Sequence, residues 1–82
     1  MPSPPVDTPV QTAAGTIKAV DLMGRELVVH VDGSVQVFDL PLDCAILLNG
    51  ERVKLLLLQP TDRVRLTYRN VNGRRQARLV EV

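Results

Sequence analysis

Residue types that carry chemistry are scarce in this chain of 82 residues, which has one cysteine, one histidine, no tryptophan and only two aromatic side chains, Phe38 and Tyr68. A single cysteine excludes an internal disulfide framework. The shortage of aromatic rings argues against a platform that stacks the bases of single-stranded nucleic acid. No stretch approaches the ~20 apolar residues of a membrane-spanning helix. These absences leave a small domain that aliphatic side chains must hold together.

Candidates for catalysis or metal binding are equally few. The chain contains no HExxH, CxxC, G-x-S-x-G or phosphate-loop motif. The side chains suited to a soft metal have no ligand-like spacing; they are Met1, Met23, His30 and Cys44. We expect His30 on the outward face of a strand and Cys44 as a semi-buried, unreactive thiol. The sequence therefore predicts no enzyme, no cofactor and no metal site.

Aliphatic residues are abundant, with 13 valines and 12 leucines. This apolar content is too high for a disordered chain, and the runs of Val, Thr and Ile favour strands over helices. A chain of this length buries roughly 60–65% of its unfolded surface, which is enough for one domain to fold alone. We therefore predict a single all-β domain.

The first nine residues, MPSPPVDTP, include four prolines. They have neither the basic start nor the apolar centre of a signal peptide, and their composition is typical of an extended tail. We therefore predict a disordered, Pro-rich tail over residues 1–14 and a single β-barrel domain over 15–82. As the chain stands we expect a cytoplasmic protein, whereas we expect an exported one if the chain is cut from a longer precursor.

Two strands and a hairpin are expected after Gly15. In the first strand, GTIKAV, the apolar Ile17 and Val20 are three positions apart, which breaks strict alternation and indicates a bulge. The segment RELVVHV follows with apolar residues at alternate positions. Asp32-Gly33 then predicts a hairpin leading into SVQVFDL.

The register of this hairpin has two alternatives. A two-residue turn at Asp32-Gly33 pairs Leu27 with Phe38 and mixes the polar Gln36 into the buried face. A three-residue loop around the same glycine pairs Leu27 with Val37 instead. We favour the longer loop because it places four apolar residues on one face, and because a one-residue slip turns a whole face outward.

Further along the chain, the patterns predict a short strand and a helical turn. CAILLNG predicts the strand, with Ile46 and Leu48 inward and a turn at Asn49-Gly50. In VKLLLLQP, Leu55 and Leu58 are three apart and a proline follows, which predicts one helical turn closing an open end of the sheet.

The last hairpin has the clearest pattern. Polar residues alternate with apolar ones along its first strand; they are Arg63, Arg65, Thr67 and Arg69. Asn72-Gly73 predicts the turn, and Ala77 and Val80 are three apart, which indicates a second bulge. The pattern as a whole predicts a small, strongly bent antiparallel barrel, SH3-like or OB-like, with five or six strands and one short helical turn near 55–58.

Short motifs recur in a definite order along the chain. They are G-T-I-x-x-V-D at 15–21, L-x-V at 27–29, N-G at 49–50, L-x-x-L-x-P-x-D-x-V at 55–64 and A-x-x-V-x-V at 77–82. This order resembles a widespread group of uncharacterised small bacterial β-barrel domains, which often occur in exported proteins. The resemblance implies a small β-barrel without catalytic residues. Likeness to small copper-binding barrels is expected in shape alone.

The chain departs from that group at two places. Thr61 stands where the group usually has glycine, so its turn must avoid a positive φ or be strained. Leu56 and Leu57 stand where polar residues are usual. We expect both to be exposed and to be candidates for contact with a protein, unless the segment rotates and shelters one of them.

Charge is distributed unevenly along the chain. Residues 1–50 carry two basic and six acidic side chains, whereas 51–82 carry eight basic and three acidic ones. Six arginines near the end are candidates for contact with an anion or a nucleic acid: Arg63, Arg65, Arg69, Arg74, Arg75 and Arg78. The favoured interpretation is a solvated strand face, because outer faces need polar side chains and arginines protect sheet edges.

The sequence therefore predicts a non-enzymatic binding or accessory module that contacts another protein or its own copy. The alternative is a nucleic-acid-binding barrel that uses the arginine-rich hairpin. Expected partners are a protein or a second copy, with nucleic acid less favoured and no membrane span. The sequence identifies no small-molecule ligand.

Overall fold

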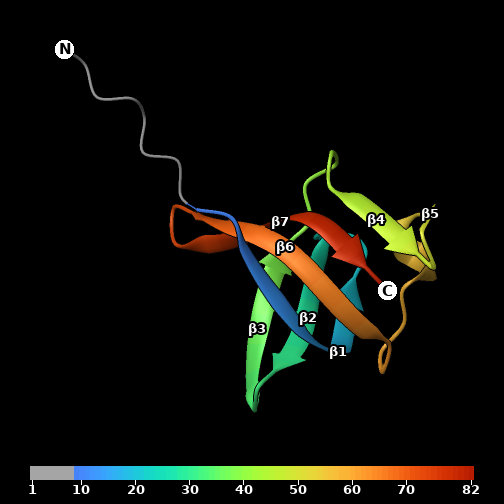
Figure 1. The fold of residues 1–82 in the computed structure, drawn as a ribbon, viewed down its shortest axis with the longest axis horizontal. Coiled ribbons are helices and arrows are strands. Elements are labelled where there is room, and N and C mark those ends of the chain that lie inside the picture. Colours follow the sequence, from blue (N-terminus) through green and yellow to red (C-terminus); the bar gives the residue numbers. More distant parts are fainter. Residues whose placement is uncertain (1–8) are drawn as a thin grey trace.

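Alternation of apolar and polar residues produces seven strands in the computed structural model of the chain, which describes residues 9–82 (Figure 1). The strands are β1 (Gln11–Asp21), β2 (Glu26–Val31), β3 (Ser34–Asp39), β4 (Ala45–Leu48), β5 (Glu51–Arg52), β6 (Arg63–Val71) and β7 (Arg74–Glu81). One 3₁₀ turn, η1 (Leu55–Leu57), precedes β6. Residues 9–82 include no helix long and apolar enough to cross a membrane.

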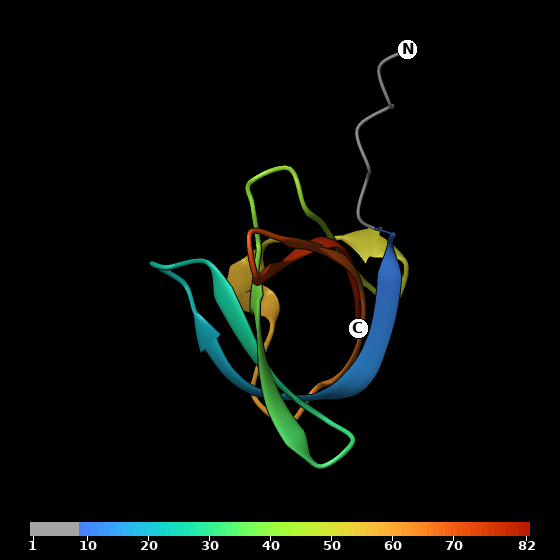
Figure 2. The ribbon, with the colours of Figure 1, turned by 90° about the vertical axis from the view of Figure 1, so that its left-hand side faces the viewer.

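The strands form one sheet that closes on itself. Their order is β3-β2-β1-β6-β7-β4-β5, and an additional pairing of β3 with β7 completes a ring of five strands (Figure 2). This closed, OB-like barrel confirms the predicted fold class, with seven strands in place of five or six. Strand β7 pairs parallel to β3 and to β4, whereas the other pairs are antiparallel.

Two bulges let the sheet bend. β1 pairs with β6 through its first half and with β2 through its second half, and its register against β2 shifts between Ile17 and Ala19. A second shift lies opposite Thr67 and Tyr68 of β6, beside Arg78. Both positions agree with the bulges predicted from the three-residue spacings. An extra residue increases local twist, and β1 accordingly curves around the barrel (Figure 2).

The hairpin between β2 and β3 has the two-residue register, so the favoured three-residue loop is wrong. Leu27 pairs with Phe38, and Asp32 and Gly33 both have positive φ, at 48° and 79°, as a type I′ turn requires. Phe38 is completely buried while Val37 faces outward. Burial of the phenyl ring removes more apolar surface from water than burial of a valine.

The leucine run forms the predicted helical turn. Leu55 and Leu58 are buried, whereas Leu56 is 62% and Leu57 48% exposed, so the segment does not rotate to shelter either one. Thr61 has a φ of 80°, in the left-handed region that a β-branched residue rarely adopts. Of the two predicted alternatives, the turn is therefore the strained one. The Thr61 backbone N–H donates to the carbonyl of Ile17 at 2.8 Å, which ties the turn to β1.

The barrel is filled by side chains from nearly every strand. The largest fully buried side chains are Phe38, Ile17, Leu27, Leu40, Leu66, Val29 and Val80. The Phe38 and Tyr68 rings meet edge to face, with centroids 5.1 Å apart, and the Tyr68 hydroxyl donates to Gln11 Oε1 at 3.1 Å. β1 begins at Gln11, so the barrel starts before Gly15, the expected start. Residues 1–8 of the predicted tail lie outside the described residues.

Candidate functional site

Arg74 forms ion pairs with two acidic residues from the first half of the chain. Its Nε donates to Asp39 Oδ2 at 2.6 Å, and one terminal nitrogen donates to Asp39 Oδ1 at 2.7 Å and to Glu26 Oε2 at 2.9 Å. The hydrogen bond from Arg74 holds the pKa of Asp39 below its usual range, and the same pair raises the pKa of Arg74. This arginine is therefore neutralised within the protein.

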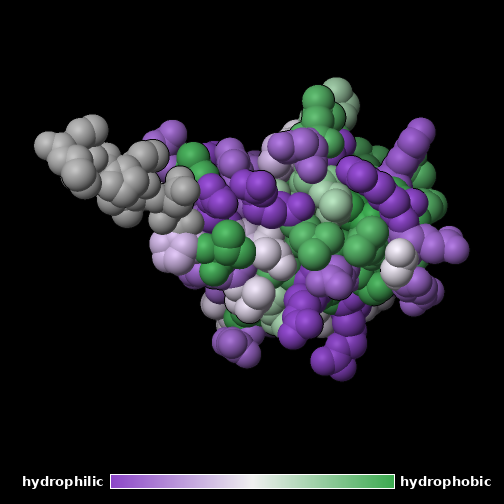
Figure 3. All heavy atoms as spheres, turned by 45° about the horizontal axis from the view of Figure 1, so that its top comes forward, coloured by the Kyte–Doolittle hydropathy of each residue, from purple (hydrophilic) through white to green (hydrophobic). Residues whose placement is uncertain are grey.

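The other five arginines of the predicted set do not share one environment. The Arg75 guanidinium lies 5.9 Å from the centroid of the Phe38 ring, in range for a cation–π contact. Arg69 is half-buried, and its Nε has no hydrogen-bond partner among the described residues. Only three arginines of the predicted set are exposed without such engagements; they are Arg63, Arg65 and Arg78. In Figure 3 hydrophilic side chains are spread among apolar ones on the face shown.

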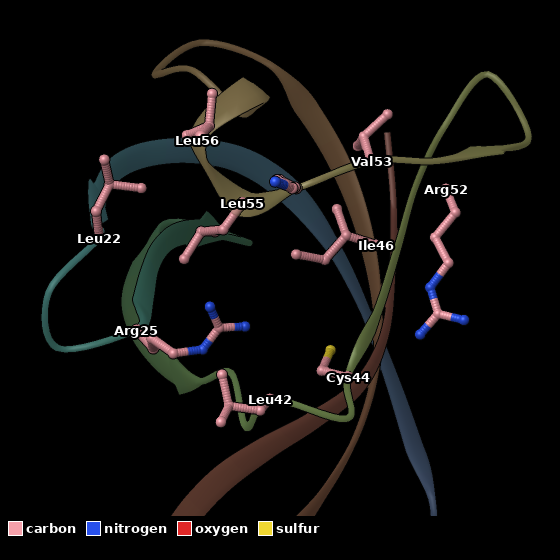
Figure 4. Close-up of a pocket in the computed structure, with 10 residues that line it drawn as sticks. Leu22, Arg25, Leu42, Cys44, Ile46, Arg52, Val53, Leu55 and Leu56 are labelled. Carbon is pink, nitrogen blue, oxygen red and sulfur yellow. The ribbon is translucent and has the colours of Figure 1, made fainter.

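An opening at one end of the barrel is lined by reactive and charged side chains. An opening of about 420 Å³ lies between the turn joining β1 to β2, the start of β4, and the segment from β5 into η1 (Figure 4). We call it the η1 opening. Its floor is apolar and consists of three buried side chains, Cys44, Ile46 and Leu55. It is the candidate site because it combines a thiol, a hollow and charged side chains.

Strand periodicity places the thiol there. Cys44 immediately precedes β4 and Ile46 lies two positions further along, so both side chains point to the interior face. A turn holds the cysteine backbone, because its N–H donates to the carbonyl of Pro41 at 2.9 Å. The Cys44 Sγ lies 3.6 Å from the carbonyl oxygen of Ala45, which makes a weak S–H hydrogen bond.

Burial controls the acidity of this thiol. Loss of solvation raises the pKa of Cys44 to about 11, because a thiolate is poorly stabilised away from water. The positive charges of Arg25, Arg78 and Arg52 act in the opposite direction, while Asp43 adds to the rise. At neutral pH the side chain is therefore a protonated thiol.

The raised pKa of Cys44 predicts a loss of stability in alkaline solution. The folded state keeps the thiol proton to higher pH than the unfolded chain, where the pKa returns to its ordinary 9.0. The stabilising contribution is present below about pH 9 and is lost as the pH rises toward about 11. In urea unfolding at about pH 8 and pH 10.5, we expect the wild type to lose about 1–2 kcal/mol more than Cys44→Ser. Equal losses would contradict a buried thiol.

Arg25 presents its charge to the η1 opening from a fixed position. Its Nε donates to the carbonyl of Leu40 at 2.8 Å, and the Leu40 N–H donates back to the Arg25 carbonyl at 2.8 Å. This anchoring leaves the terminal nitrogens free, and in Figure 4 the guanidinium points into the opening. Arg52 and Lys54 add two further cations, and no acidic side chain of the described residues lines the opening.

The soft donors identified from the sequence do not meet. Met23 is exposed in the turn between β1 and β2, and His30 is exposed on β2, where it lines a separate depression beside Lys18. Met1 lies outside the described residues. Within residues 9–82, no three His, Cys, Asp or Glu side chains are close enough to hold a metal ion. Cys44 is therefore the one donor of this set that lines the η1 opening.

Sequence reasoning treated Cys44 as an ordinary structural thiol and did not place Arg25, Arg52 or Lys54 beside it. These residues come from separate elements, and no local pattern connects them. The only local signal was the two-residue spacing of Cys44 and Ile46, which indicates a shared face.

Comparison with known proteins identifies the fold. No family model and no curated protein sequence matches the chain. Among solved structures, the chain is similar to apo-CusF from Escherichia coli, with a TM-score of 0.78, 14% identity, and coverage of 98% of this chain and 94% of that chain. It is also similar to Ag(I)CusF, with a TM-score of 0.74, 16% identity and 90% and 97% coverage. At these identities the likeness shows a small CusF-like β-barrel fold. The predicted group of bacterial domains is not confirmed, because no family model matches its sequence motifs.

This comparison overturns the functional prediction. A bound species is named for three of the similar structures, and it is Ag(I) or Cu(II). The prediction of a module that contacts another protein, its own copy or a nucleic acid is therefore wrong, and the expected partners are wrong with it. The structure also gives a physical reason why the arginine-rich hairpin is a poor site for nucleic acid. Arg74 is ion-paired with two acidic side chains, and Arg75 lies over the Phe38 ring.

Proposed function

We propose that this barrel binds a soft monovalent metal ion, Ag(I) or Cu(I), through the Cys44 thiolate in the η1 opening. The observation that carries the proposal is the position of Cys44, because the only thiol of the chain lines a hollow with an apolar floor. Support comes from the CusF-like fold, since similar barrels are named with Ag(I).

The donor chemistry favours this class of ion over others. Thiolate is a soft ligand that selects monovalent copper and its relatives, whereas calcium and magnesium require several oxygen ligands. The described residues hold no cluster of three His, Cys, Asp or Glu side chains, which argues against a closed tetrahedral zinc site. Soft monovalent ions accept low coordination numbers, so one protein thiolate and a ligand from solution are sufficient.

The charges around the opening are compatible with a thiolate. Arg25 and Arg52 each act to lower the pKa of Cys44, so they stabilise the deprotonated form that binds metal. A monovalent ion on one thiolate makes a neutral unit, and the nearby cations do not repel a neutral unit as they would a bare ion. Binding displaces the thiol proton, so affinity should increase with pH.

Removal of the thiol tests the proposal. Wild-type protein in thiol-free buffer is expected to bind one Ag(I), counted by native mass spectrometry. The Cys44→Ser variant is expected to bind at least about 100-fold more weakly in competition with a chelator, because a hydroxyl is a hard and weak ligand for this ion.

Two further variants serve as matched controls. Met23→Leu and His30→Gln remove the other described soft donors, which lie outside the η1 opening, and both should retain wild-type affinity. Wild-type affinity in Cys44→Ser would refute the proposal, as would loss of binding in His30→Gln with Cys44 intact.

A further inference from the structure

Exposed leucines gather around the η1 opening. Leu22 is 53%, Leu42 84% and Leu56 62% exposed, and all three line it. They come from three separate segments: the turn after β1, the loop after β3, and η1. They border the apolar floor of Ile46 and Leu55, and their exposed side chains offer an apolar surface that a ligand could cover.

The charged side chains that line this surface are all basic, although Asp43 lies near enough to act on the Cys44 thiol. Arg25, Arg52 and Lys54 line the opening with no acidic neighbour among its lining residues. The hollow beside Arg74 differs, because Glu26 and Asp39 line it and form ion pairs with that arginine. The basic side chains of the η1 opening are therefore available to bind an anion from outside the protein.

We infer that the η1 opening binds a small organic anion with an apolar chain, of which a free medium-chain carboxylate is the simplest example. The carboxylate lies among Arg25, Arg52 and Lys54, and the chain lies against Ile46 and Leu55. The inference goes beyond the proposed metal binding and does not depend on it, because the thiol has no part in recognising this ligand.

Size and geometry favour a small molecule of this class. The volume of about 420 Å³ lies in the lower part of the range for ligand pockets, roughly 300–1,000 Å³. The Arg25 guanidinium is held through its Nε, and its two remaining nitrogens suit a carboxylate, which accepts paired hydrogen bonds from arginine. The leucine rim adds an apolar contact that an inorganic anion could not use.

The test uses three probes that separate charge from chain. Decanoate below its micelle-forming concentration has both features, decyltrimethylammonium has the chain with the opposite charge, and acetate has the charge without the chain. By NMR titration of the full chain, we expect decanoate to bind with a dissociation constant of about 0.1–1 mM. Amide shifts should cluster at Cys44, Ile46 and Leu56. The other two probes should bind at least about tenfold more weakly.

Charge variants then locate the binding. The double variant Arg52→Gln/Lys54→Gln is expected to weaken decanoate binding about tenfold or more. Both side chains are exposed, so the fold should persist, and an unchanged thermal midpoint would show this. The control Arg63→Gln/Arg65→Gln removes two cations from β6, outside the opening, and should bind as the wild type does.

Several outcomes would overturn the inference. They are equal binding of decanoate and decyltrimethylammonium, shifts that map elsewhere, or a decanoate affinity unchanged in Arg52→Gln/Lys54→Gln. Binding to phosphatidylglycerol vesicles without binding to free decanoate would also overturn it, in favour of a membrane surface. Ag(I) binding and decanoate binding are each measured on the wild type, so failure of this inference and failure of the metal proposal remain separate results.

Discussion

Replacing Phe38 by alanine is expected to lower the free energy of unfolding by about 3–5 kcal/mol, the range for removal of a buried aromatic ring. Phe38 is completely buried and meets the Tyr68 ring edge to face at 5.1 Å. Arg75 also lies over the Phe38 ring. Truncation therefore leaves a cavity and removes the contacts of two neighbours. A loss of this size is a large fraction of the ~5–15 kcal/mol that stabilises a typical domain.

The adjacent residue provides the control for this experiment. Val37→Ala removes an outward-facing side chain that is 41% exposed, and its cost in urea unfolding should stay near about 0.5 kcal/mol. If Phe38→Ala unfolds the protein entirely, Phe38→Leu should still cost more than Val37→Ala. The pair also tests the hairpin register, because the three-residue loop would turn Val37 inward and Phe38 outward. A larger cost at Val37 would contradict the register described here.

Local features of the fold could be predicted because neighbouring residues determine them. The turn residues Asn49-Gly50 and Asn72-Gly73 adopt the positive φ values that such pairs favour. The bulges near Lys18 and Arg78 follow from apolar residues three positions apart. The register after Asp32-Gly33 was mispredicted because counting apolar residues on each face gave a valine the same weight as a phenylalanine. The larger ring decides which face is buried.

Long-range features could not be read from the same patterns. The parallel pairing of β7 with β3 and β4 closes the barrel, yet it joins segments with no local link. The arginine pattern correctly identified an outer strand face, but the partners of Arg74 are Glu26 and Asp39, far away along the chain. The η1 opening was missed for the same reason, because Cys44 and Arg25 belong to different elements and meet only in the folded barrel.

Gly15→Ala is expected to destabilise the protein by at least about 3 kcal/mol, the upper end of the usual cost of overpacking. A Cβ at this position would lie 2.1 Å from the carbonyl oxygen of His30 and 3.0 Å from Val29 Cγ1. The oxygen belongs to the backbone of β2, so relief requires β1 and β2 to separate where β1 passes from β6 to β2. Urea unfolding of Gly15→Ala and the wild type measures the cost.

Gly33→Ala separates this steric effect from backbone conformation. Gly33 has a φ of 79° and no atom within 4 Å of an added Cβ, so its substitution should cost about 1–2 kcal/mol through the left-handed backbone alone. Gly15 is required for the opposite reason, since an added methyl group has no space against β2. Its cost should therefore clearly exceed that of Gly33→Ala. A smaller cost at Gly15 would mean that β1 and β2 do not approach closely there, and that the barrel bends at another point of the chain.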